Sequence, residues 1–169
     1  MAIPRLRAWP AVSMAVLSVV AALAVAAPAS AASSATQRQV DAYLAGHPGG
    51  QQINSREISY SNGTFIVTVV PAVATSAPDC PPGWFCFYAH TNFGYPRGKL
   101  SDCGWQDLST WGWQNRTESV HYNLSTGSVA FIGESGSTDS VLFTVDTGRR
   151  AIADVSPYRN QADFVYRYC

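Results

Sequence analysis

The pattern of hydrophobic and polar positions predicts one short helix followed by β-rich structure. Apolar side chains at Val40, Tyr43 and Leu44 have helical spacing. Gly46, Pro48 and the Gly49-Gly50 pair are expected to end this helix. Residues 57–70 read EISYSNGTFIVTVV, where runs of β-branched and aromatic residues flank Asn-Gly, the strongest short signal for a hairpin turn. We therefore expect a small α+β module over residues 32–70.

Two further segments follow, a linker-like one and a β-rich one. Residues 71–79, PAVATSAPD, hold small residues and Pro without periodicity, which is typical of a linker. Residues 80–169 hold short β-like runs separated by Gly, Ser, Asp and Asn, which predicts an all-β sandwich. The 32–70 module is too small for a sizeable core of its own, so we expect a removable pro-segment or a flap that packs on the rest.

An internal repeat relates the two halves of this β domain, which we divide into units 80–124 and 125–169. The segments WQNRTESV and YRNQADFV place Asn115 and Asn160 at an offset of 45 residues (160 minus 115). Units of this size are hard to stabilise singly. Packed face to face, each would bury the apolar side of the other.

Residues 1–31 have the features of a secretory signal peptide. Arg5 and Arg7 give a positive start, residues 11–27 are apolar and uncharged, and Ala29-Ser30-Ala31 fits a signal-peptidase site. A transmembrane anchor is disfavoured, because the apolar run covers 17 residues (11 to 27) and small residues follow it. We expect a secreted, extracellular protein without a membrane anchor, and the alanine-rich signal is typical of bacterial export.

The charge balance excludes several classes of partner. The sequence holds 11 basic and 11 acidic residues. Two of the basic residues lie in the signal peptide, so the mature balance is 9 minus 11, or −2. Nucleic-acid binders and polybasic membrane segments need a basic patch, which is missing. We expect no nucleic acid as a partner, and we expect a monomer.

The cysteines predict disulfides. An even number in an exported chain favours pairing over free thiols. Three pairings are open, and Cys169, the last residue, is expected to tie down the chain end. Zinc is disfavoured, because the first two cysteines miss the usual spacing, the histidines are isolated and no HExxH occurs. The four residues are Cys80, Cys86, Cys103 and Cys169.

No constellation for catalysis stands out. The chain lacks G-x-S-x-G, and GESG at residues 133–136 resembles it only superficially. Cys86 and His90 would lie on one face of a strand but about 13 Å apart, beyond hydrogen-bond reach. We therefore expect that the protein is not an enzyme.

Two motifs carry a family resemblance. FYAHTNFG (87–94), with Tyr88 and Phe93, resembles the aromatic hairpin of βγ-crystallin-type double Greek keys, although Gly94 comes one place early. Residues 80–86, CPPGWFC, are similar to the secreted form in peptidase inhibitor family I36, whose founding member inhibits thermolysin-type metalloproteinases. The resemblance covers residues 80–169. It implies a βγ-crystallin-like double Greek-key sandwich that blocks a (metallo)peptidase cleft with a disulfide-braced loop.

The resemblance directs attention to a hairpin tip and to the tryptophan-rich loop at residues 104–117. We expect Trp113 to fill the core, as its repeat partner Tyr158 is also aromatic, and Trp105 is a second candidate for the core. The candidate contacts with a peptidase are Thr91, Asn92, Phe93, Tyr95, Arg97 and Trp111.

The resemblance also implies Ca²⁺ as the one candidate metal, and otherwise we expect no cofactor. Microbial βγ-crystallins bind Ca²⁺ through a short motif in each unit, and the copies here depart from it at two or more positions. The candidate ligands are Asn115, Glu118, Asn160 and Asp163. The competing interpretation is that these are turn residues. The alternative function is a non-inhibitory extracellular module that binds Ca²⁺ or polysaccharide, or has a structural role.

Overall fold

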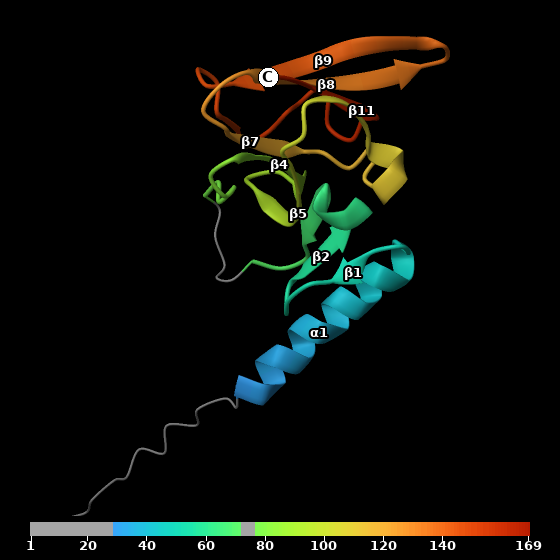
Figure 1. The fold of residues 1–169 in the computed structure, drawn as a ribbon, viewed down its shortest axis with the longest axis vertical. Coiled ribbons are helices and arrows are strands. Elements are labelled where there is room, and N and C mark those ends of the chain that lie inside the picture. Colours follow the sequence, from blue (N-terminus) through green and yellow to red (C-terminus); the bar gives the residue numbers. More distant parts are fainter. Residues whose placement is uncertain (1–28, 72–76) are drawn as a thin grey trace, which may run out of the picture.

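The computed structural model describes residues 29–71 and 77–169 (Figure 1). Most of the predicted signal peptide and residues 72–76 of the predicted linker lie outside the described residues. The first described element is helix α1, Ala29–Gly46, which confirms the predicted helix. No helix in the described part of the chain has the length and apolar character needed to cross a membrane.

The predicted hairpin is also confirmed. Strands β2 (Glu57–Tyr60) and β3 (Phe65–Thr68) pair antiparallel, and a short 3-10 turn joins them. Asn62 in that turn has φ 55°, a left-handed conformation that asparagine tolerates better than most residues. A two-residue strand, β1 (Gln51–Gln52), pairs with the outer edge of β2.

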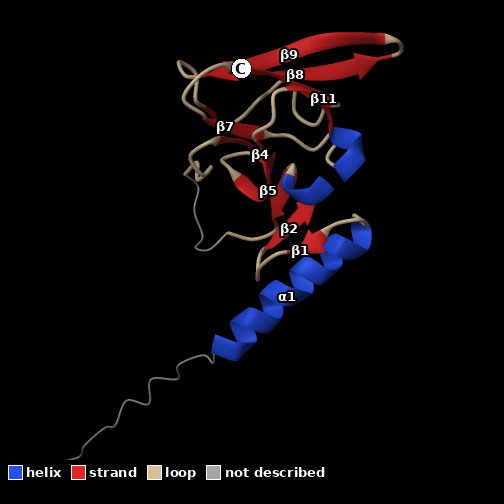
Figure 2. Ribbon diagram, viewed as in Figure 1, coloured by secondary structure: helices blue, strands red, loops and turns tan. Residues whose placement is uncertain are grey.

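The described chain is mostly β-structure in two antiparallel sheets (Figure 2). The larger sheet has the order β1-β2-β3-β5-β4-β7-β10, and the smaller has the order β6-β11-β8-β9. The strands of the larger sheet not yet described are β4 (Trp84–His90), β5 (Gly94–Leu100), β7 (Ser119–Asn123) and β10 (Ala151–Ile152). Those of the smaller sheet are β6 (Gly104–Asp107), β8 (Ser128–Ser135), β9 (Thr138–Asp146) and β11 (Phe164–Tyr168).

The two repeat units exchange strands. From the first unit, β6 leaves its neighbours and pairs with β11 of the second unit, with Trp105 opposite Tyr166. In return, β10 of the second unit pairs with β7 of the first, with Ala151 opposite His121. Each sheet therefore contains strands of both units, so the units cannot separate without breaking both sheets.

The N-terminal hairpin is part of the larger sheet. Strand β3 pairs with β5, with Ile66 opposite Lys99. Helix α1 lies beside β1 and β2 at this end of the molecule (Figure 2). Arg116 from the loop before β7 reaches the helix end, with 2.8 Å between its Nη1 and Nε2 of His47. The module thus packs on the β domain through backbone and side-chain contacts.

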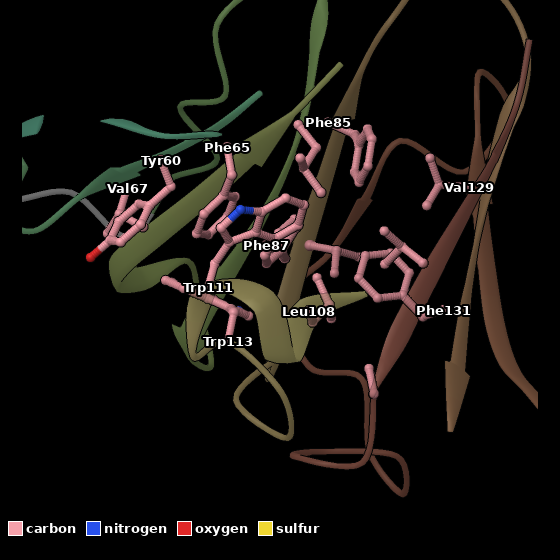
Figure 3. Close-up of a cluster of buried hydrophobic side chains, with 14 of the residues drawn as sticks. Tyr60, Phe65, Val67, Phe85, Phe87, Leu108, Trp111, Trp113, Val129 and Phe131 are labelled. Atoms are coloured by element: carbon pink, nitrogen blue, oxygen red, sulfur yellow. The ribbon is translucent and has the colours of Figure 1, made fainter. Parts of the chain in front are cut away.

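The core fills the space between the sheets with aromatic side chains (Figure 3). Trp113 is fully buried, which confirms its predicted place, and it meets Phe87 edge-on at 5.3 Å between ring centroids. Phe65 of the N-terminal hairpin lies in the same cluster, 5.9 Å from Phe87. Trp105, in contrast, is 47% exposed and lies outside this core.

Two disulfides brace the domain and confirm the cysteine prediction. Cys80 pairs with Cys86 across the entry to β4. Cys103 pairs with Cys169, so the last residue of the chain is tied to the loop before β6.

Candidate functional site

The tip of the β4–β5 hairpin is held by the rest of the domain. The backbone N–H of Thr91 donates to Oε2 of Glu118 (3.2 Å), and that of Phe93 donates to Oγ of Ser119 (3.0 Å). The N–H of Asn92 donates to the carbonyl of Ala153 in the second unit (2.7 Å). Three successive donors are therefore fixed, which gives the tip a defined shape.

The structure brings the tip residues together but turns some of them inward. Phe93 is buried and meets Tyr88 edge-on, with 5.5 Å between ring centroids. A Cβ atom on Gly94 would lie 2.7 Å from Cβ of His90, which explains glycine there. Thr91 is half-buried and Asn92 is exposed, so these two form the outer surface of the tip.

Two other candidate contacts lie in the interior. Arg97 is only 5% exposed. Trp111 is 6% exposed, stacks on Phe65 at 4.7 Å between ring centroids, and donates from Nε1 to Oγ of Ser61 (3.0 Å). Both side chains therefore pack against the N-terminal hairpin, a surface that sequence patterns do not reveal.

A set of charged side chains, which we call the hairpin clasp, joins this hairpin to the β domain. Asp79 accepts from the Tyr88 hydroxyl (2.9 Å) and the Tyr95 hydroxyl, and its carboxylate lies 3.0 Å from Nη1 of Arg97. Nζ of Lys99 lies 2.8 Å from Oε1 of Glu57 on β2. The linker end, the hairpin and strand β5 thus meet in one polar network.

The clasp changes the acidity of its carboxyls. Burial would raise the pKa of Asp79, but hydrogen bonds from Tyr95 and Tyr88 and the charge of Arg97 outweigh burial and hold the pKa below its ordinary value. Burial is likewise outweighed at Glu57, where hydrogen bonds from Lys99 and Asn54 lower the pKa. Both carboxylates therefore stabilise the folded chain only while they are ionised.

We expect acid to weaken the clasp. A carboxyl with a lowered folded-state pKa adds stability at pH values above its unfolded pKa of about 4, and this stability is lost as pH falls through the folded value. Denaturant unfolding at pH 7 and pH 3 should show a smaller pH effect for Asp79→Asn than for the wild type. The control is Asp139→Asn, which removes an exposed carboxyl of β9 outside the clasp. Equal pH dependence of wild type and Asp79→Asn would contradict this role.

The repeat asparagines stand at matching positions between the units. Asn115 and Asn160 both have φ 55°, and each donates its backbone N–H to the other unit. The acceptors are the carbonyls of Ala162 (2.8 Å) and Thr117 (3.0 Å). The repeat seen in the sequence is thus an approximate two-fold relation between two loops.

The carboxylates of these loops accept hydrogen bonds from protein groups on both oxygens. Glu118 accepts from Nδ2 of Asn160 (2.8 Å) and from the backbone of Thr91. Asp163 accepts from Nε2 of Gln114 (2.6 Å) and from the N–H of Glu134 (2.7 Å). No group of three or more His, Cys, Asp or Glu gathers in the described residues. This donor set fits Ca²⁺ poorly, because that ion takes six to eight oxygen ligands.

Sequence reasoning did not identify the β8–β9 hairpin as a candidate contact. Its two strands project from the smaller sheet (Figure 1), and residues 134–141 are all exposed. At its base, a polar cleft of about 680 Å³ is lined by residues that include Gln114, Glu134 and Asp163. The tip sequence GESGST is polar and short, so only strand length and exposure identify it.

The comparisons with known proteins place the chain beside one family. Residues 73–139 match the model of peptidase inhibitor family I36. The resemblance to family I36 is confirmed. The I36 match runs from the linker through the first unit to the tip of the β8–β9 hairpin. No curated protein and no solved structure matches significantly.

Proposed function

We propose that this protein is a secreted proteinase inhibitor that blocks the cleft of a metallopeptidase of the thermolysin type, and that it is not an enzyme. The I36 match over residues 73–139 carries this proposal. The two disulfides and the secretory character of residues 1–31 support an extracellular site of action.

The β4–β5 tip is one contact that we propose. Its three fixed backbone donors and the Cys80–Cys86 disulfide hold the loop before any partner arrives. A loop that is already ordered loses little entropy on binding. Thr91, Asn92 and the half-exposed Tyr95 supply its outer surface, and the buried Phe93 would support the contact from within. Arg97 and Trp111 pack against the N-terminal hairpin instead, so we do not propose them as contacts.

The β8–β9 hairpin is the second contact that we propose. It projects from the smaller sheet, and residues 134–141 at its end are all exposed. A two-stranded hairpin of this kind is narrow enough to enter a peptidase cleft. The 45-residue repeat matches β8 with β4, and each of these strands pairs with the strand that follows it. The β8–β9 hairpin therefore corresponds to the β4–β5 hairpin.

We also propose that the sandwich is a βγ-crystallin-like double Greek key. The exchange of β6 and β10 between the sheets supports this fold. Each unit then keeps three strands in one sheet and donates its third strand in sequence to the other.

A panel of secreted peptidases, assayed with and without reductant, tests the proposed function. We expect micromolar protein to inhibit a metallopeptidase, and we expect reduction of the disulfides to weaken inhibition. Serine and cysteine peptidases in the same panel are the controls for target class. An absence of inhibition across the whole panel would contradict the proposal.

The alternative is a non-inhibitory module that binds Ca²⁺ through Asn115, Glu118, Asn160 and Asp163. Because both oxygens of each carboxylate already accept from protein donors, we expect millimolar Ca²⁺ to raise the melting temperature by less than about 1 °C. Calorimetric titration and thermal melts check this, with Mg²⁺ as the control ion. A saturable heat with Ca²⁺ and a clear rise in melting temperature would favour the alternative.

We propose that the module over residues 32–70 acts as a pro-segment or docking flap. Strand β3 pairs with β5, so a cut in the linker would leave the module bound to the domain. We expect native gel filtration to hold any cut fragments together and denaturant to separate them. Intact mass of the secreted protein locates the cuts: a start at residue 32 marks signal removal, and a second species starting near Cys80 marks processing.

A further inference from the structure

The outer face of the smaller sheet carries a row of four aromatic rings, which we call the aromatic strip. Trp105 lies on β6, and the other three rings lie on the neighbouring strand β11. Ring centroids are 5.0 Å apart for Trp105 and Phe164, 6.3 Å for Trp105 and Tyr166, and 4.6 Å for Tyr166 and Tyr168. Alternate residues of a strand share a face, so these rings form one continuous surface.

The strip faces away from the core. Val165, which lies between two strip residues in sequence, is fully buried in the inter-sheet cluster, so its neighbours must point outward. Trp105 is 47% exposed and Tyr168 is 53% exposed. Cross-strand aromatic pairs stabilise a sheet only modestly. That gain leaves the exposure of two large rings unexplained.

The four rings of the strip carry no charge. By strand register its face also holds uncharged residues of β8 and β9: Ser128, Ala130, Ile132 and Thr144. Two carboxylates lie at the ends of this face, Asp107 opposite Phe164 and Asp146 opposite Ser128, and each already accepts a backbone hydrogen bond. Oδ1 of Asp107 accepts from the N–H of Ser109 (2.8 Å), and Oδ1 of Asp146 accepts from the N–H of Gly148 (2.7 Å). Sites for single-stranded nucleic acid combine aromatic rings with cations, and no cation lies among these positions.

The strip is also small for a protein partner. A fully buried aromatic side chain covers about 150–250 Å², so four rings that are at most about half exposed offer less than about 500 Å². A stable protein interface buries about 800 Å² on each partner. A narrow, neutral ligand fits this area better than a second copy of the chain.

We propose that the aromatic strip binds a neutral polysaccharide. The C–H faces of sugar rings would stack on the aromatic faces, and the hydroxyls of Tyr166 and Tyr168 would bond to sugar oxygens. The row of rings along β6 and β11 matches a linear chain. This site goes beyond the proposed inhibition, because none of its residues belongs to the β4–β5 tip or to the β8–β9 hairpin.

Co-sedimentation of the secreted protein with insoluble chitin and with insoluble cellulose tests the proposal. We expect the wild type to bind at least one of them in 1 M NaCl, since no charge takes part. Trp105→Ala should weaken binding at least tenfold, and Trp105→Phe should keep most of it. Tyr158→Ala is the matched control, since Tyr158 is an exposed aromatic (38%) that stacks on Phe143 outside the strip. Melting temperatures confirm that each variant is folded.

Three results would overturn the proposal: no binding to either polysaccharide, equal binding by Trp105→Ala and the wild type, or loss of binding in 1 M NaCl. Dimerisation of the wild type without polysaccharide, abolished by Trp105→Ala, would assign the strip to a second copy instead. Peptidase inhibition by Trp105→Ala is measured in parallel and should equal that of the wild type, so the two functions can fail separately.

Discussion

Replacing Phe65 with alanine should lower the free energy of unfolding by about 3–5 kcal/mol, the usual range for a buried phenylalanine. Phe65 is fully buried and touches rings from both the hairpin and the β domain: Tyr60, Phe87, Trp111 and Trp113. Its loss leaves a cavity between the module and the domain, so we expect both to unfold together at lower denaturant. Denaturant titration followed by tryptophan fluorescence measures the change.

Ile66→Ala is the matched control for this prediction. Ile66 is the next residue on β3, half-buried, and it faces the opposite side of the sheet. We expect a clearly smaller loss from it than from Phe65→Ala. If Phe65→Ala unfolds with the wild-type midpoint, the hairpin is not part of the cooperative core.

Removing the Cys103–Cys169 disulfide should destabilise the protein more than removing Cys80–Cys86. The first bridge joins residues 66 apart in sequence and the second joins residues 6 apart. In the chain-entropy account, loops of these lengths correspond to about 4 and about 2 kcal/mol of stabilisation. The paired serine variants, Cys103→Ser with Cys169→Ser and Cys80→Ser with Cys86→Ser, give the two values by denaturant titration.

The short bridge serves as the control for the long one, since both variants lose two sulfurs. The long bridge also anchors the chain end. This end packs closely against the loop before β8, since a Cβ on Gly127 would lie 2.0 Å from the carbonyl oxygen of Tyr168. Loss of the long bridge should therefore free β11 as well. An equal or larger loss from the Cys80–Cys86 variant would contradict the loop-length argument.

The sequence was most informative where signals were local. Asn62-Gly63 predicted the hairpin turn, and the helical spacing around Val40 predicted α1. The offset between Asn115 and Asn160 pointed to two loops that have the same backbone conformation and exchange backbone hydrogen bonds. Each of these signals depends on nearby residues or on repetition along the chain. Such signals can be recognised without knowledge of tertiary contacts.

The sequence was least informative where distant segments meet. Trp111 and Trp105 look alike in a tryptophan-rich loop, yet Trp111 is covered by Phe65 and Trp105 faces outward. The difference comes from the pairing of β3 with β5 and of β6 with β11, and strand pairing over such separations has no local signature. The burial of Arg97 could not be predicted for the same reason, because its clasp partners Glu57 and Asp79 are not its neighbours in the sequence.

Inhibition of thermolysin can be measured by titrating a known amount of the active enzyme with the mature protein. We expect activity to fall in proportion to added protein and to be lost near an equimolar ratio. A variant with a shortened β8–β9 hairpin or an altered Thr91–Asn92 tip should need more protein. Full thermolysin activity at micromolar concentrations and tenfold molar excess of folded, disulfide-bonded protein would contradict the claim for this class of peptidase.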